Sequence, residues 1–183
     1  MGPASKLVFS SSVEPLLKVT PWDRLSSATR QQLAAMRISP SHKLEPAYPA
    51  QDWAKAVKLI SGELFRGLEP DVQHRELGQA TVQQFTEGFL GKAMFTAARL
   101  VGARRVLERM SHNLRSGANY LDAKLTVVDE RSWELWLSDV TDVPGFYAGI
   151  LSAGVGKLEG WPDRIEIKQR DGDACWYSLQ RTS

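Results

Sequence analysis

Apolar residues in the first two thirds of the chain recur at the three- and four-residue spacing of helices. Residues 50–65 predict an amphipathic helix whose apolar stripe is Trp53, Val57, Ile60 and Leu64. The same period predicts further helices over about 23–36, from about 71, over 92–101 and over 103–114. We therefore expect residues 23–117 to form a helical half. Residues 1–22 carry an ambiguous pattern and are assigned in part to disorder.

From residue 118 onward the apolar period shortens to two. Residues 120–128 and 132–138 alternate in this way and predict a hairpin. Residues 164–169 and 174–180 alternate around a tight-turn signal and predict a second hairpin. The chain, residues 1–183, is therefore expected to be one α+β domain. Its N-terminal helices precede a sheet half, 118–183, in which hairpin, helix and hairpin form a four-stranded antiparallel sheet with helices on one face.

The segment 144–158, PGFYAGILSAGVGKL, is apolar nearly all round and begins with proline, which suits the first turn of a helix. A helix of this kind is normally covered on more than one side. The predicted sheet supplies one cover, and further helices, a second subunit or a ligand would supply the other. A second copy of the chain would contact Tyr147, Leu151 and Leu158, whereas a ligand would contact Phe146 and Ile150.

Composition excludes several classes of function. A net charge of +2 gives no bulk electrostatic case for nucleic acid or an anionic membrane, and no apolar run is long enough to span a bilayer. The single cysteine, Cys175, allows no internal disulfide and favours a reducing, cytoplasmic setting. The histidines, His42, His74 and His112, lack metal-site spacing, and phosphate-loop and nucleophile motifs are absent. We therefore predict no metal site and no catalytic residue.

The run RRVLERMSHNLRSGANY, residues 104–120, concentrates arginines near one helix end. Arg105 and Arg109 share a helix face, and Arg115 lies in the following loop. Guanidinium groups suit phosphate or carboxylate, so these arginines are candidates for binding an anionic head group. The alternative is a solvated helix end with no ligand. A third possibility is an enzyme that acts on an anionic substrate at the junction from Arg109 to Tyr120.

The outer face of the predicted sheet carries aromatic residues beside lysines, a combination that can stack on bases. Its aromatic residues are Tyr120, Trp136 and Trp176. Acidic residues, among them Glu134, share that face and oppose a polyanion. We therefore predict a protein interface at Trp136 and Trp176, with plain packing at the sheet edge as the alternative.

Four runs, AYPAQDWAKAVKL, ERMSHNLRSGANY, ELWLSDV and PGFYAGIL, resemble a myxobacterial family of uncharacterised paralogous proteins. The linking motif N-x-R-S-G-x-N-Y is carried by Asn113, Arg115, Ser116, Gly117, Asn119 and Tyr120. The order of elements is also similar to vinyl-reductase-like domains, trafficking-complex (TRAPP) subunits and haem nitric-oxide-binding domains. The haem domains use a histidine with a motif of tyrosine, serine and arginine. The run RSGANY does not match that motif, and the cofactor is left unassigned.

The leading hypothesis is a non-enzymatic, cytoplasmic regulatory or sensor module. It would bind a small hydrophobic or amphipathic ligand between helices and sheet, or a protein partner, and no nucleic acid. The candidate ligand-binding residues are Phe85, Phe89, Phe95, Phe146, Ile150, Arg105, Arg109, Arg115, Asn119 and Tyr120. A homodimeric scaffold without ligand is the alternative from a second class, and the enzyme is a third.

Overall fold

A computed structural model describes residues 5–87, 89–154 and 158–182, without the side chains of Phe89, Leu90 and Met94. Its helices are α1 (Ser10–Val19), α2 (Ser27–Ala35), α3 (Ala50–Leu64), α4 (Pro70–Glu87), α5 (Phe89–Val101), α6 (Ala103–Glu108), α7 (Met110–Arg115) and α8 (Pro144–Ser152), with a 3-10 turn at Trp22–Arg24. Its strands are β1 (Leu7–Phe9), β2 (Ala47–Pro49), β3 (Ala123–Val127), β4 (Ser132–Leu137), β5 (Arg164–Asp171) and β6 (Ala174–Gln180). The predicted α+β class and the predicted order of elements are confirmed.

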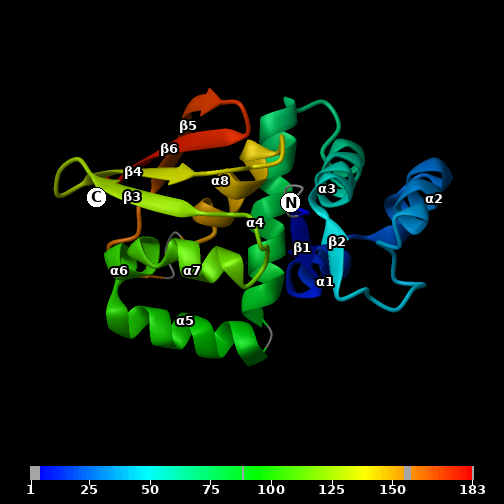
Figure 1. The fold of residues 1–183 in the computed structure, drawn as a ribbon, viewed down its shortest axis with the longest axis horizontal. Helices are drawn as coiled ribbons and strands as arrows, with labels where there is room; N and C mark the ends of the chain where they lie inside the picture. The colour runs from blue at the N-terminus through cyan, green and yellow to red at the C-terminus, as the bar shows by residue number, and fades with distance from the viewer. Residues whose placement is uncertain (1–4, 88, 155–157, 183) are drawn as a thin grey trace.

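The four-stranded sheet is antiparallel throughout, in the order β3-β4-β6-β5. Alternation gives it one apolar face, with Leu135 opposite Tyr177 in the register and both side chains fully buried. The other face carries exposed Lys124 and Thr126. The helices cover the apolar face, and α8 lies between the sheet and α4 (Figure 1).

Helix α8 is buried almost completely, as its all-round apolarity predicts: seven of its nine residues are buried. Its backbone lies directly against that of α4. A Cβ atom built at Gly149 would lie 2.1 Å from the carbonyl oxygen of Arg75, and one at Gly78 would lie 2.2 Å from that of Phe146. Glycine is therefore required on both helices for this approach.

The predicted interface residues of this segment need correction. Tyr147, Leu151 and Leu158 are only 6%, 3% and 5% exposed within a single chain. The chain's own sheet and helices supply the cover, because α8 packs between them. These three side chains are thus not available to a second copy.

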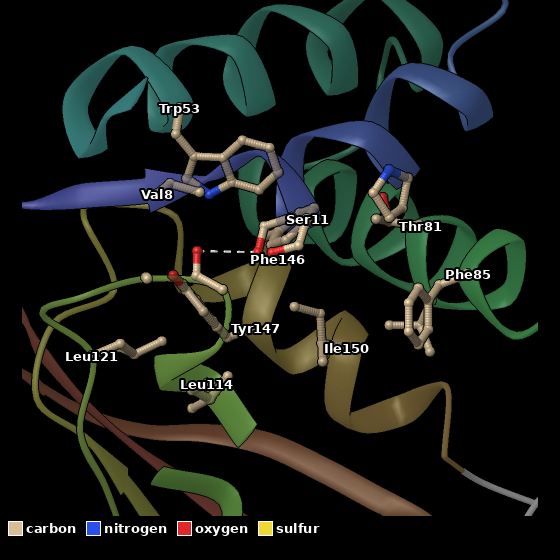
Figure 2. Close-up of a pocket in the computed structure, with 15 residues that line it drawn as sticks. Val8, Ser11, Trp53, Thr81, Phe85, Leu114, Leu121, Phe146, Tyr147 and Ile150 are labelled. Carbon is tan, nitrogen blue, oxygen red and sulfur yellow. Dashed lines mark hydrogen bonds between the residues drawn. The ribbon is translucent and has the colours of Figure 1, made fainter. Parts of the chain in front are cut away.

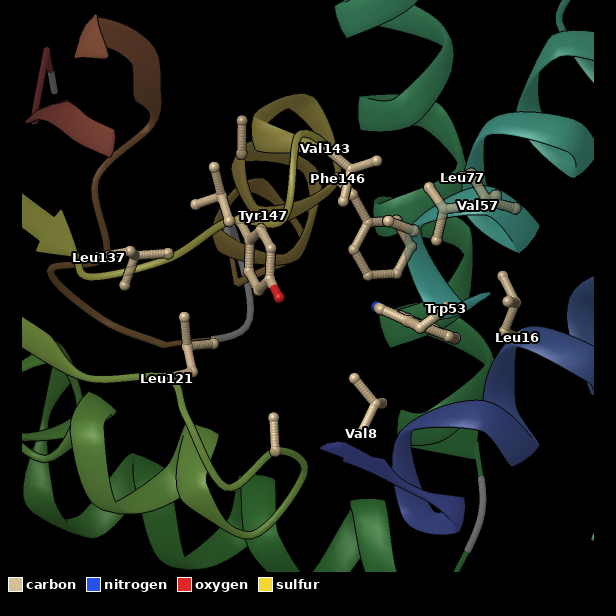
Figure 3. Close-up of a cluster of buried hydrophobic side chains, with 14 of the residues drawn as sticks. Val8, Leu16, Trp53, Val57, Leu77, Leu121, Leu137, Val143, Phe146 and Tyr147 are labelled. Carbon is tan, nitrogen blue, oxygen red and sulfur yellow. The ribbon is translucent and has the colours of Figure 1, made fainter. Parts of the chain in front are cut away.

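The centre of the core joins the helices to the sheet. Trp53 of α3 meets Phe146 of α8 edge to face, with ring centroids 5.5 Å apart. Figure 3 shows Val57 and Leu77 on one side of this pair and Leu137 of the sheet on the other. One apolar core therefore spans both halves of the chain.

The N-terminal region departs from expectation. Strand β1 pairs with β2, Val8 opposite Tyr48, and α1 follows with Pro15 inside it. Residues 5–22 are ordered in β1, α1 and the start of the 3-10 turn, while residues 1–4 lie outside the described part. The physical reason is burial: Val8, Val13 and Leu16 are at most 2% exposed, and three-residue strands are too short to show an alternating pattern.

Candidate functional site

The larger of two neighbouring apolar cavities lies among α4, α5, α7 and α8 and has a volume of about 450 Å³. Its apolar lining consists of Val82, Phe85, Phe95, Ala97, Ala98, Val101, Val106, Met110, Leu114, Ile150, Gly154, Leu158 and Trp161. This volume falls within the range of roughly 300–1,000 Å³ typical of small-molecule sites. The cavity is therefore the best candidate for a binding site in the described chain.

A smaller cavity of about 160 Å³ lies on the other side of Phe85 and Ile150, toward α1 and Trp53. Figure 2 shows Phe85 of α4 and Ile150 of α8 facing one another along it. These two residues line both cavities, together with Val82 and Leu114. The four side chains form a partition, and a movement of them would join the two spaces.

Polar groups are few and lie at the rim of the larger cavity. Arg109, between α6 and α7, and Asn113 of α7 are the polar lining residues, and both are exposed. Arg109 makes no ion pair with any carboxylate of residues 5–87, 89–154 and 158–182. An apolar interior with one cationic donor at its mouth suits an amphipathic molecule that carries an anionic group.

Arg115 has a different role from Arg109. Its Nε and Nη2 donate to Asp122 Oδ1 at 2.9 and 2.5 Å, so its charge is matched within the chain. Arg105 lies exposed on α6 and lines neither cavity. The three arginines therefore do not converge on one anion. Arg105 lies on α6, Arg109 lies at the break between α6 and α7, and Arg115 is paired with Asp122 just before β3.

The N-x-R-S-G-x-N-Y motif holds the N-terminal strand. Asn119 Oδ1 accepts from the Leu7 amide at 2.8 Å, and its Nδ2 donates to Ser5 O at 3.0 Å. The Phe9 amide donates to Gly117 O at 2.8 Å. A Cβ atom at Gly117 would lie 2.3 Å from Ser12 Oγ, so glycine permits this contact. Asn119 lines neither cavity.

Tyr120, the last residue of the motif, contacts the loop that precedes α8. Its hydroxyl lies 3.0 Å from Thr141 Oγ1. Burial raises the pKa of Tyr120, and burial raises the pKa of Tyr147 well above its ordinary value. Both phenols therefore stay neutral at physiological pH and act as hydrogen-bonding groups.

The structure thus brings together some of the predicted ligand-binding residues. Phe85, Phe95, Ile150 and Arg109 line the larger cavity, and Phe146 lines the smaller one. The side chain of Phe89 lies outside the described part. Sequence reasoning missed Asn113 and Trp161 as lining residues. Asn113 is a polar residue on α7 between the apolar lining residues Met110 and Leu114, and Trp161 follows a loop.

Catalytic groups are absent from the larger cavity. None of its described lining residues is a histidine, cysteine, aspartate or glutamate. Burial raises the pKa of Cys175, which disfavours its thiolate. Across residues 5–87, 89–154 and 158–182, no three acidic, histidine or cysteine side chains gather as a metal site. The described lining of the larger cavity therefore offers no acid or base of these types, whereas Asp122 contacts Ser111 and Arg115 at the junction from Arg109 to Tyr120.

Two further hollows have charged side chains in their lining. One, between β1, α3 and the turn before α8, is crossed by ion pairs of Lys6 with Asp139 at 2.5 Å and of Lys58 with Asp142. The other lies on the outer sheet face, where the rings of Trp136 and Trp176 are 6.3 Å apart. An interface at these tryptophans stays a prediction.

Comparison with protein families places the chain. A model of the family described as "Protein of unknown function (DUF2378)" matches residues 6–180. The chain belongs to the DUF2378 family. No curated protein sequence matches it significantly. Membership fixes the family without assigning an activity.

Solved structures of H-NOX domains are similar in fold. An H-NOX protein from K. algicida, with unliganded Fe(II), has a TM-score of 0.65 at 8% identity, over 94% of this chain and 96% of that one. A mutant of the T. tengcongensis H-NOX has a TM-score of 0.61 at 14% identity, over 94% of each chain. An oxygen-binding H-NOX domain related to soluble guanylate cyclases has a TM-score of 0.60 at 12% identity, over 92% of this chain and 89% of that one. The predicted similarity to haem nitric-oxide-binding domains is confirmed for the fold.

Haem does not fit the residues present. Haem iron is held by histidine, cysteine thiolate, tyrosine, or methionine paired with histidine. No histidine lines either cavity among the described residues: His112 is exposed, His42 contacts Ser39 at 3.0 Å, and His74 is buried elsewhere on α4. Met110 in the larger cavity has no histidine partner there. Tyr147 lines the smaller cavity, but burial raises its pKa well above its ordinary value and so disfavours the phenolate that would bind iron. The fold is thus shared, whereas the described lining of the two cavities offers no suitable haem donor.

No helix of the described chain combines the length and the apolar character needed to cross a membrane.

Proposed function

We propose that this chain is a cytoplasmic, non-enzymatic sensor or regulatory module whose larger cavity binds an amphipathic small molecule. The ligand would have an apolar body and a single anionic group. The observation that supports this most directly is a cavity of about 450 Å³ with an apolar interior and, at its rim, Arg109, which pairs with no carboxylate of the described residues. The H-NOX-like fold lends support because an H-NOX domain of similar fold binds oxygen, a small ligand.

The two parts of the ligand would contact different residues. Its apolar body would lie among Phe95, Val106 and Ile150, where burial removes it from water. Its carboxylate or phosphate would meet the guanidinium of Arg109, with the amide of Asn113 beside it. A long chain would displace the Phe85 partition and reach the smaller cavity. This displacement would be a conformational change that a partner protein could recognise.

Titration with cis-parinarate, a fluorescent fatty acid, tests the apolar part of the site. Emission should rise on binding to the wild type, because the cavity excludes water. Ala98→Trp fills the cavity and should abolish the rise. Ala93→Trp is the matched control, since Ala93 is exposed on the same helix and lines neither cavity. Equal titrations of the two variants would refute the site.

Arg109→Ala tests the anionic part. Binding of the fatty acid should weaken about five- to tenfold, as for a charge-assisted bond at a half-open rim. Binding of the corresponding fatty alcohol should not change, and Arg105→Ala should affect neither ligand. If Arg109→Ala weakened acid and alcohol alike, the head-group assignment would be wrong while the cavity stood.

A further inference from the structure

The charge of the chain is distributed unevenly. It contains 23 Lys and Arg against 21 Asp and Glu, but residues 89–115 hold six of the basic residues and one of the acidic ones. The remainder of the chain is therefore net acidic. The single acid, Glu108, is already paired with Arg104 at 2.8 Å. The modest net charge of the whole molecule hides a strongly basic α5–α7 region.

The same region carries the most exposed large apolar side chain described. Leu100, at the end of α5, is 86% exposed, and its neighbour Val101 is 39% exposed. Arg105 is exposed one helical turn beyond the bend at Gly102. We call residues 99–105 the α5–α6 corner. Figure 1 shows that α5 and α6 lie at the edge of the molecule, away from the strands β1 and β2.

We propose that the α5–α6 corner docks on an anionic membrane surface. Leu100 would enter the boundary between head groups and acyl chains, and Arg105 and Arg109 would meet the lipid phosphates. An exposed leucine gains nothing from a nucleic-acid backbone, so the combination of leucine and arginine favours lipid over another polyanion. This binding is peripheral and requires no helix to cross the membrane.

The corner adjoins the proposed ligand site. Val101 and Arg109 belong to the basic region and also line the larger cavity. An amphipathic molecule that leaves the membrane at the corner would thus meet the mouth of the cavity directly. In this respect the inference rests on the proposed function and names the source of the ligand, whereas the docking itself is measurable without any ligand in the cavity.

Co-sedimentation with vesicles tests the docking. The wild type should sediment with vesicles of equimolar phosphatidylcholine and phosphatidylglycerol, and only weakly with phosphatidylcholine alone. Leu100→Glu and Arg105→Glu should each lower the partition coefficient about fivefold or more, as expected for loss of one basic or apolar anchor. Added salt should lower binding of the wild type because it screens the arginines.

Matched controls come from the turn between β3 and β4. Val128 is 58% exposed, and Arg131 is exposed beside it. Val128→Glu and Arg131→Glu make the same changes in charge and should leave vesicle binding within about twofold of the wild type. Equal losses in corner and control variants would overturn the proposal, and so would wild-type binding that is indifferent to phosphatidylglycerol. Binding to duplex DNA in place of vesicles would overturn it as well.

The parinarate titration, repeated on Leu100→Glu without vesicles, separates the two proposals. Unchanged parinarate binding with lost vesicle binding supports the corner as a docking surface distinct from the cavity. Vesicle binding that depends on Leu100, in a protein that never binds parinarate, would retain the docking surface and refute the ligand site. Parinarate binding without any vesicle binding would do the reverse.

Discussion

The two flanks of α8 are packed in opposite ways. Toward α4, Gly149 lies against the Arg75 backbone so closely that no Cβ atom fits. Toward α5 and α7, Ile150 borders two cavities. Both flanks are apolar, yet one is filled by backbone and the other leaves space. Apolarity of a helix therefore indicates burial, whereas the size of its residues decides whether anything else fits beside it.

The largest effect expected is that of Gly149→Ala. The new methyl group would overlap the Arg75 carbonyl, so the helices must separate, and the free energy of unfolding should fall by about 3 kcal/mol or more. Urea denaturation measures it. Gly62→Ala is the control, because its Cβ atom would meet nothing nearer than 3.7 Å, and it should raise stability by about 0.5–1 kcal/mol. Equal changes would mean that the close contact of α4 and α8 is wrong.

A second comparison adds the same bulk to each flank. Ala148 is 2% exposed within α8, and Ala148→Leu should destabilise the fold by about 1–3 kcal/mol through overpacking. Ala98 lines the larger cavity, so the leucine side chain of Ala98→Leu should enter that space. The free energy of unfolding should then change by no more than about 0.5 kcal/mol. Thermal unfolding of both variants checks this. A cost for Ala98→Leu as large as that for Ala148→Leu would show that the cavity is closed in solution.

A smaller effect should follow removal of one hydroxyl group on the packed side. Tyr177 donates to Pro144 O at 2.9 Å and fixes the start of α8 on the sheet. Tyr177→Phe removes this buried hydrogen bond and should cost about 1–1.5 kcal/mol. Tyr120→Phe, at a half-buried bond, should cost about 0.5 kcal/mol. If urea denaturation showed a larger loss for Tyr120→Phe than for Tyr177→Phe, the bond to Thr141 would be the main attachment of α8.

The smallest effect concerns pH. Burial lowers the pKa of His74 on α4 below its ordinary 6.5, so the unfolded chain takes up this proton at a higher pH than the folded chain. Stability should therefore fall as pH drops below about 6.5, until the lower folded-state pKa is passed. His74→Gln should remove this part of the pH dependence. Denaturation at about pH 7.5 and about pH 5 measures the difference.

Most of the fold was predictable because each element carries its own period. The stripe of Trp53, Val57 and Ile60 specifies α3, and the alternation from Trp133 to Leu137 specifies β4. The pairing of β1 with β2 was not predictable, since Val8 and Tyr48 lie in three-residue strands that long-range packing stabilises. Prolines beside Tyr48 also indicate a loop when the sequence is considered alone.

The site was predictable only in part. Phe85 and Ile150 were found because apolar residues on helices point inward, and Arg109 because cations gather near helix ends. Arg115 could not be distinguished from Arg109, because its partner Asp122 lies seven residues away across a bend. Which buried surfaces leave a void between them depends on helix distances that no local pattern encodes.

The attachment of β1 has a consequence for the order of events during synthesis. Leu7 bonds to the side chain of Asn119, 112 residues later in the chain. At about 5–20 residues per second, a ribosome needs roughly 6–22 seconds to add that stretch. The bond from Leu7 to Asn119 cannot form during this interval, although Tyr48, the strand partner of Val8, has already been synthesised. Strand β1 is thus synthesised first, but its bond to Asn119 forms late.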